Sequence, residues 1–323
     1  MDLLNLTGNE VSLDISSQNY TIYSQPKAGK TTLAYKLFGE RALLLGFEQG
    51  YHMIKGIHAV PVKTYADMQK VIRQLKNEQV KEKYDVVVFD TIDLFHLMCE
   101  KYLCQQNGVA EIGQVGAMGA GYQKLDNIIH DIILQIQSLG YKLFFISHAN
   151  IRKTTINTTQ GEIEVEKMYP SVPKRTEKII SKFCDNIFYI SMEVDQEGKL
   201  TRKLYTRDNK ISFGGTRMEH LPNVLPLDPE VIKAEIKKAL ELAGGEEGVS
   251  VNINYTTQKL NYEDIMNKIT SIVKGQIAPQ GRMGELKEIT EKHLGIGASI
   301  MKAEAHQVEA LAVILGELED LIK

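Results

Sequence analysis

Short apolar runs alternate with longer amphipathic stretches along most of this chain. Four such runs lie at residues 20–23, 41–48, 86–89 and 143–146. Uninterrupted apolar runs of this length predict strands that are buried on both faces of a parallel sheet. Apolar residues at helical spacing predict helices over residues 64–80 and 122–136. Strands alternating with helices indicate an α/β fold with right-handed crossovers.

Two polar segments interrupt this alternation. Residues 104–121 are rich in Gln, Gly and Ala, which predicts a mobile loop. Residues 152–178 form a second long polar segment that mixes basic and acidic side chains, and it is also expected to be a loop. Residues 187–191 and 202–206 alternate apolar and polar positions on either side of a Glu-Gly pair. That pattern predicts a β-hairpin.

The C-terminal part of the chain is predicted to be helical. One helix is expected over residues 226–242, and the sequence Gly-Gly-Glu-Glu-Gly that follows it is typical of a linker. Three short helices are then expected at 262–273, 284–293 and 303–322. We therefore expect an N-terminal segment, an α/β core, a linker and a small helical C-terminal domain, at residues 1–19, 20–242, 243–255 and 256–323.

The loop after the first predicted strand carries the strongest chemical signal. The phosphate-binding pattern G-x-x-x-x-G-K-[ST] is matched, except at its first glycine, by Ser24-Gln25-Pro26-Lys27-Ala28-Gly29-Lys30-Thr31-Thr32. Backbone N–H groups at the start of a helix attract phosphate. On this interpretation Lys30 reaches the β- and γ-phosphates, Thr31 coordinates Mg²⁺ and Gly29 lets the backbone approach. If the first position needed positive φ, serine there would cost about 1–2 kcal/mol.

Three more predicted strands lead into polar side chains: Glu48, Asp90 and His148. Because ligands of parallel sheets bind beyond the carboxyl ends of the strands, we expect all three beside the phosphate loop. Asp90 is expected to hold Mg²⁺ with Thr31, and Glu48 to activate or position the attacking water. His148 is a candidate sensor of the γ-phosphate. Each residue also has a simpler explanation. Asp90 could be a helix cap, Glu48 a solvated carboxylate and His148 a structural histidine.

The charge and the cysteine content limit which binding partners and which cellular compartment we expect for this protein. The chain has 323 residues, a net charge of −3 and a pI of about 6.3, so a nucleic acid would have to meet a local groove. No apolar run approaches the ~20 residues that span a bilayer, and the N-terminus lacks a basic leader. The three cysteines, which show no C-x-x-C spacing, fit buried thiols in a reducing compartment. We expect a soluble, cytoplasmic protein.

The order of these features resembles the RecA-type recombinase core. A phosphate loop is followed by a strand ending in glutamate, a Walker B strand ending in Asp90, a glycine-rich loop and a strand ending in a sensing residue. Residues 22–32 together with 87–93 resemble compact phage-encoded ATPases of this group, which act as single-strand annealing proteins in recombination. The resemblance covers roughly residues 15–240. His148 stands where better-known members carry glutamine.

The resemblance implies a DNA-dependent ATPase, using ATP and Mg²⁺, that anneals or pairs single-stranded DNA in the host cytoplasm. It implies that residues 104–121 and 152–178 face DNA, with contacts from Arg152, Lys153, Lys167, Lys174 and Arg175. It also implies a homo-oligomeric filament or ring in which a cation enters the neighbouring subunit's ATP site. Lys210 is the first candidate for this cation, and Arg207 is the second. A single-strand-binding protein is a further candidate partner.

Two other functions stay open on the sequence. A helicase or loader built on the same core would unwind a forked duplex. A phosphotransferase acting on a small metabolite would behave as a monomer, and the glycine-rich loop and C-terminal helices argue against it. The C-terminal helices also carry basic residues that are candidates for a second DNA or partner surface: Lys268, Lys274, Arg282, Lys287 and Lys302.

Overall fold

The computed structural model describes residues 8, 10–159, 161–194, 197–249 and 260–322. The chain forms two compact units, Met1–Tyr255 and Thr256–Lys323, and each is considered by itself. The described residues contain no helix that is both long and apolar enough to cross a membrane.

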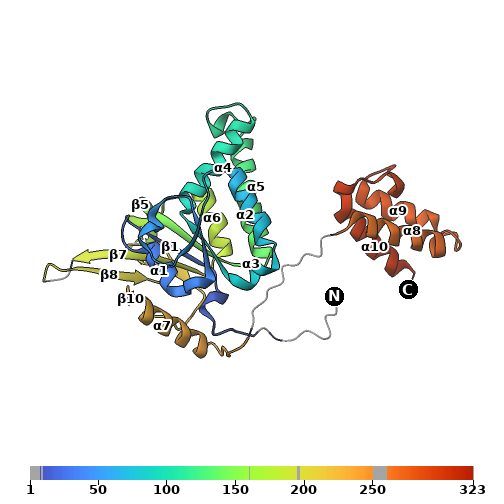
Figure 1. The fold of residues 1–323 in the computed structure, drawn as a ribbon. Helices are drawn as coiled ribbons and strands as arrows, with labels where there is room; N and C mark the ends of the chain where they lie inside the picture. Colours follow the sequence, from blue (N-terminus) through green and yellow to red (C-terminus); the bar gives the residue numbers. More distant parts are fainter. Residues whose placement is uncertain (1–7, 9, 160, 195–196, 250–259, 323) are drawn as a thin grey trace. The chain divides into compact units, whose positions relative to one another are not determined.

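The first unit is built on a mainly parallel, ten-stranded sheet (Figure 1). Its strands are β1 (Tyr20–Ser24), β2 (Ala42–Gly46), β3 (His58–Pro61), β4 (Val86–Asp90), β5 (Lys142–Thr158), β6 (Gly161–Pro170), β7 (Asn186–Val194), β8 (Leu200–Tyr205), β9 (Gly215–Thr216) and β10 (Val224–Pro226). The strand order is β10-β8-β7-β1-β5-β4-β2-β3, with β6 beside β5 and β9 beside β7. Strand β1 is parallel to both of its neighbours, β5 and β7.

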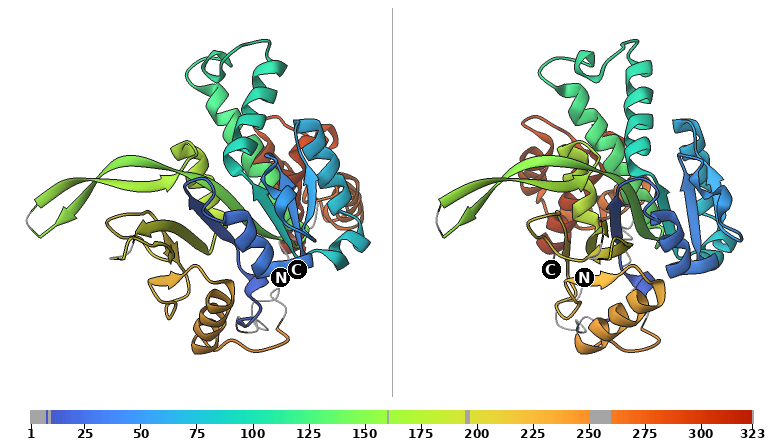
Figure 2. Two further views of the ribbon diagram at one scale, coloured as in Figure 1. Left: turned by 60° about the vertical axis from the view of Figure 1, so that its left-hand side comes forward. Right: turned by 90° about the vertical axis from the view of Figure 1, so that its left-hand side faces the viewer.

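Helices cover both faces of this sheet, as Figures 1 and 2 show. They are α1 (Lys30–Phe38), α2 (Tyr65–Leu75), α3 (Glu78–Lys83), α4 (Ile92–Gln106), α5 (Ala120–Ser138), α6 (Lys174–Phe183) and α7 (Pro229–Leu242). Successive strand residues point to opposite faces, so Val86 and Val88 pack with α1 and α7, whereas Val87 and Phe89 pack with α2, α4, α5 and α6. The predicted α/β fold with a parallel sheet between helices is confirmed.

Two predicted elements have different boundaries in the structure. The helix expected over 64–80 is two helices, because the Asn77 side chain caps a new helix, α3, by accepting from the Gln79 N–H. The loop expected over 104–121 begins only after Gln106 and gives way to α5 at Ala120. Ile112, within this segment, is buried against the core, so part of it is packed rather than solvated.

The second polar segment, 152–178, was predicted wrongly as a loop. The structure instead has the antiparallel ribbon of β5 and β6, followed by α6. Figure 2 shows this ribbon projecting from the sheet. Ile151 and Ile163 on the ribbon are 58% and 44% exposed. Both faces of the ribbon are largely solvated, so its sequence lacks the apolar face that marks a buried strand.

The second unit is a small helical bundle. It contains α8 (Tyr262–Ile272), a π-helical turn (Val273–Ile277), α9 (Met283–Leu294) and α10 (Val308–Leu321). Apolar residues of all three helices share one core. The three helices predicted from the sequence are therefore confirmed, although the last one begins at Val308 rather than 303.

Candidate nucleotide-binding site

The phosphate loop connects the carboxyl end of β1 to the first residue of α1. Ser24 is the last residue of β1, and positive φ occurs later, at Lys27 (65°) and Gly29 (102°). The left-handed turn that favours glycine therefore does not fall on Ser24, and serine is tolerated there without backbone strain. Gly29 caps α1 without a side-chain hydrogen bond, so the first backbone N–H groups of the helix are available to an anion.

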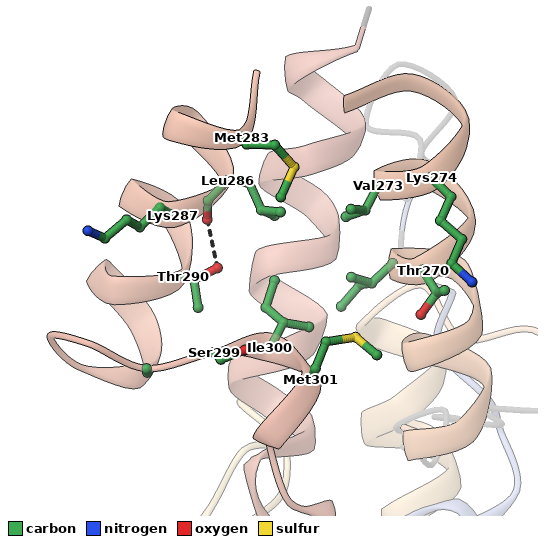
Figure 3. Close-up of a pocket in the computed structure, with 12 residues that line it drawn as sticks. Thr270, Val273, Lys274, Met283, Leu286, Lys287, Thr290, Ser299, Ile300 and Met301 are labelled. Atoms are coloured by element: carbon green, nitrogen blue, oxygen red, sulfur yellow. Dashed lines mark hydrogen bonds between the residues drawn. The ribbon is translucent and has the colours of Figure 1, made fainter. Parts of the chain in front are cut away.

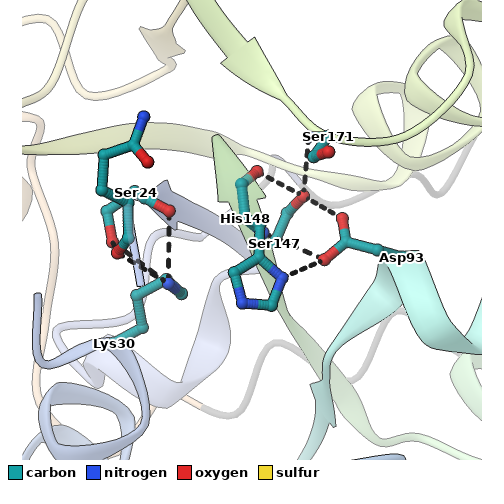
Figure 4. A network of polar contacts seen from close by, with 7 residues as sticks. Ser24, Lys30, Asp93, Ser147, His148 and Ser171 are labelled. Carbon is teal, nitrogen blue, oxygen red and sulfur yellow. Dashed lines mark hydrogen bonds and ion pairs between the residues drawn. The ribbon is translucent and has the colours of Figure 1, made fainter. Parts of the chain in front are cut away.

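Lys30 lies across the mouth of this loop. Its Nζ donates to the Ser24 carbonyl at 3.3 Å, the Ser24 Oγ at 3.2 Å and the Gln25 carbonyl at 3.2 Å (Figure 4). Burial lowers the pKa of Lys30, while the carboxylates of Asp90 and Glu48 oppose that shift. The ammonium group is thus held against the first residues of the phosphate loop, close to the two acidic groups predicted to share its site.

Asp90 is the buried end of β4, and its carboxylate faces α1. The Thr31 hydroxyl donates to Asp90 Oδ2 at 2.8 Å, whereas the buried Oδ1 has no hydrogen-bond partner within the described part of the chain. Burial raises the pKa of Asp90 to about 6, and the nearby Glu48 charge adds to the rise. A buried carboxylate oxygen without a partner, beside a hydroxyl, fits the oxygen ligands that Mg²⁺ prefers.

A magnesium ion at this position would be held by Thr31 and Asp90. Among the described residues, no group of three His, Cys, Asp or Glu side chains is placed to hold a metal. The remaining ligands would therefore be water and phosphate oxygens, which is the usual arrangement for Mg²⁺ bound with a nucleotide. The bound ion would neutralise phosphate charge.

Glu48 reaches the same edge from the neighbouring strand. It lies two residues beyond β2, where the N–H groups of Phe47 and Glu48 donate to the Asp90 carbonyl at 2.8 and 3.3 Å. Glu48 lines a pocket of about 390 Å³ together with Lys63 and Lys101. The structure thus brings Glu48 to the sheet edge that holds Lys30 and Asp90, close enough for its charge to raise the pKa of both groups.

His148 lies next to the phosphate loop and is fixed by Asp93. It is the β5 register partner of Ser24. Asp93 Oδ2 accepts from the His148 backbone N–H at 3.0 Å and pairs with Nδ1 at 2.9 Å, while Oδ1 accepts from the Ser147 hydroxyl at 2.5 Å. The hydrogen bond to Asp93 raises the pKa of His148.

Asp93 was missed as a site residue by the sequence analysis. The available signal was its place in the first turn of α4, three residues after Asp90. The same network extends to the residue after β6, because the Ser171 N–H donates to the Ser147 hydroxyl at 3.1 Å and to the His148 carbonyl at 2.7 Å (Figure 4). The ribbon is therefore tied to the strand end that carries His148.

A second missed residue, Arg202, contacts the phosphate loop directly. Its Nη1 donates to the Ala28 carbonyl at 3.2 Å. The same nitrogen would lie 3.1 Å from a Cβ placed on Gly29, so a side chain at this position would crowd the guanidinium. Arg202 comes from β8, and only its place in the predicted hairpin was visible in the sequence. It adds a positive charge to the loop from within the same chain.

Three of the proposed DNA- or ATP-contacting cations are engaged inside the fold. Arg152, whose side chain is 15% exposed, pairs with Glu177 and donates to the Pro170 carbonyl at 2.7 Å. The Lys167 side chain is 5% exposed and pairs with Asp208 at 2.7 Å. Arg207 donates to the Met218 and Glu219 carbonyls. These contacts assign structural roles to all three.

The other predicted cations lie on the surface. Lys153 is exposed on β5 with a 3.5 Å contact to Glu164, and Lys174 is exposed in the first turn of α6. Arg175 is 55% exposed and pairs with Asp126, and Lys210 is exposed in the loop after β8. These four side chains are accessible to a partner molecule.

The fold, the phosphate loop and the Thr31–Asp90 pair define a P-loop nucleotide-binding protein of the ATPase type. The family described as "AAA domain" matches residues 16–218, more than half of the chain, and the chain belongs to this family. It is also 29% identical over 335 residues to the SPbeta prophage-derived uncharacterized protein YorG of Bacillus subtilis (strain 168), with 100% of this chain and 99% of that protein aligned.

Proposed function

We propose that this protein hydrolyses ATP with Mg²⁺ and couples hydrolysis to the pairing or annealing of single-stranded DNA in phage recombination. The observation that carries the ATPase part is the meeting of Lys30, Thr31 and Asp90 at one strand edge, with a buried Asp90 oxygen left for a cation. Lys30 and the helix N-terminus bind the phosphates, and Glu48 orients the attacking water. His148, held by Asp93, contacts the γ-phosphate side.

The DNA part of the proposal has separate support. The similar protein from Bacillus subtilis is prophage-derived, and the order of motifs in this sequence resembles recombinase cores. Lys153, Lys174 and Arg175 supply exposed positive charge on the ribbon and on α6. The ribbon is also connected to His148 through Ser171. A strand bound there would act on the site through that connection.

Oligomerisation completes the proposal. Lys210 is exposed and lies outside its own phosphate loop, so it is available to a neighbouring subunit. If a cation from the neighbouring subunit completes the ATP site, the protein would hydrolyse ATP only as an oligomer. Particle images taken with ATP and single-stranded DNA would show filaments or rings. Monomers alone under these conditions would contradict this part.

The test is ATP turnover with and without a single-stranded oligonucleotide, with Lys30→Ala as the inactive control. We expect stimulation by the oligonucleotide and retention of it on a native gel. Turnover that ignores DNA, together with no gel retention, would refute DNA coupling. Transfer of the phosphate to a small metabolite would favour the phosphotransferase. Unwinding of a forked duplex would favour the helicase.

A further inference from the structure

The C-terminal unit carries an apolar groove that its own helices leave open. The bundle core is made in part by Leu311, Ile314 and Leu318 of α10, all fully buried. Beside it lies a groove of about 300 Å³ whose twelve lining residues come from α8 and its π-helical end, from α9 and from residues 298–301. Figure 3 shows apolar side chains from these three segments around one opening.

The groove presents apolar surface to solvent. Met283 and Met301, which line it, are 49% and 74% exposed, and Ile296, two residues before the lining begins at Ala298, is 97% exposed. Single exposed apolar residues are ordinary, but several around one groove mark an interaction site. Methionine suits such a site, since its flexible thioether adapts to the shape of what it contacts.

The rim of the groove is positively charged against an acidic background. Residues 260–322 contain ten Asp and Glu and six Lys and Arg. Among the twelve lining residues, however, the charged ones are Lys274 and Lys287, and none is a carboxylate. They come from opposite sides of the groove (Figure 3). Lys287 is 72% exposed and its contact with Glu291 is long, at 3.9 Å, so its charge remains available.

We propose that this groove binds a short acidic segment of a partner protein. One or two apolar side chains of the segment fill the groove, and carboxylates on either side of them meet Lys274 and Lys287. The volume is at the low end for ligand pockets, about 300–1,000 Å³, which suits a few side chains better than a cofactor. Single-stranded DNA fits less well, because its bases stack on aromatic rings and the lining contains none.

The experiment measures binding of fluorescent nonapeptides to the full chain by polarisation. The first peptide places a Leu-Phe pair among aspartates and glutamates. The second replaces the Leu-Phe pair by serines, the third replaces the acids by lysines, and a single-stranded oligonucleotide is the fourth probe. Two variants, Lys274→Glu and Met301→Asp, are compared with Lys268→Glu, which removes an exposed lysine of α8 outside the lining. Thermal unfolding checks that each variant is folded.

We expect the first peptide to bind tightest and each groove variant to weaken it at least about tenfold, with Lys268→Glu unchanged. Peptide binding is measured without ATP hydrolysis, so the result for either groove variant does not depend on whether the proposed function is correct. Affinity weaker than ~1 mM for the first peptide would overturn the proposal. Equal binding of the lysine peptide would also overturn it. So would a groove variant that weakens the oligonucleotide but leaves the peptide unaffected.

Discussion

The buried carboxylate of Asp90 destabilises the fold, although it supplies a ligand for Mg²⁺ in the proposed site. The substitution Asp90→Asn separates these two effects. Asp90 is fully buried, and its pKa is raised from 3.8 to about 6, mainly by burial. A shift of this size corresponds to roughly 3 kcal/mol, at about 1.4 kcal/mol for each tenfold change in proton affinity. The neutral amide removes this cost but leaves hydrogen-bonding capacity for the Thr31 hydroxyl.

The sign of the pH dependence follows from the direction of the shift. An unfolded Asp90 ionises near its ordinary value of 3.8, whereas the folded chain holds the proton until about pH 6. The destabilisation is therefore fully present above about pH 6 and disappears below about pH 4. Relative to the wild type, Asp90→Asn is expected to gain roughly 3 kcal/mol at about pH 8, and about half as much at about pH 5.

Urea unfolding followed by circular dichroism at the two pH values measures this difference. Comparing the pH dependence, rather than one stability value, cancels any loss from the altered hydrogen bonds of the amide. The variant is also expected to lose Mg²⁺-dependent turnover. A stability difference that is the same at both pH values would refute the buried-charge reasoning, and full turnover would remove Asp90 from the metal site.

Other substitutions test the remaining parts of the site. Lys30→Ala should abolish both ATP binding and turnover, whereas Glu48→Gln should keep nucleotide binding and lose hydrolysis; equal loss of binding in both would mean that Glu48 is misassigned. Asp93→Asn should destabilise the fold by about 2–3 kcal/mol, because three donors lose a charged acceptor. The hydrogen bond to Asp93 raises the pKa of His148 above 6.5. The free energy that the charged His148 contributes to folding is therefore complete below pH 6.5, and it is lost as the pH rises through the raised pKa. The defect in urea unfolding should accordingly be larger near pH 6 than near pH 9, and a pH-independent defect would contradict that pairing. Arg202→Ala should raise the KM for ATP about three- to tenfold with little change in kcat, and Arg202→Lys should restore part of it; an unchanged KM would assign the arginine to loop packing alone.

The fold was predictable where the signal was local. Buried strands appear as apolar runs, and the phosphate loop is a contiguous motif, so Lys30, Thr31 and Asp90 could be assigned to one sheet edge from the sequence. The alternation of strands and helices identifies this edge, because the carboxyl ends of parallel strands lie together at one edge of the sheet. Ser24 was the uncertain position, and its extended conformation explains why serine is accepted.

The rest of the site depends on contacts between distant parts of the chain. Asp93 and His148 are 55 residues apart, and Arg202 is 174 residues from Ala28, so no local pattern could pair them. The ribbon was missed for a different reason: a strand solvated on both faces has no apolar periodicity to detect. Arg152 and Lys167 were predicted to contact DNA, because pairing of a cation with a distant carboxylate inside the fold leaves no mark in the sequence.

Strand β5 joins the nucleotide site to the ribbon. It is 17 residues long, pairs with β1 so that His148 lies opposite Ser24, and continues without a break into the strand paired with β6. The returning strand leads to Ser171, whose N–H contacts the His148 carbonyl at 2.7 Å. A displacement of His148 would therefore act on the ribbon at both of its strands. The ribbon is thus attached at two points to the strand end that carries His148, and Asp93 fixes that end through its contacts with the His148 N–H and Nδ1.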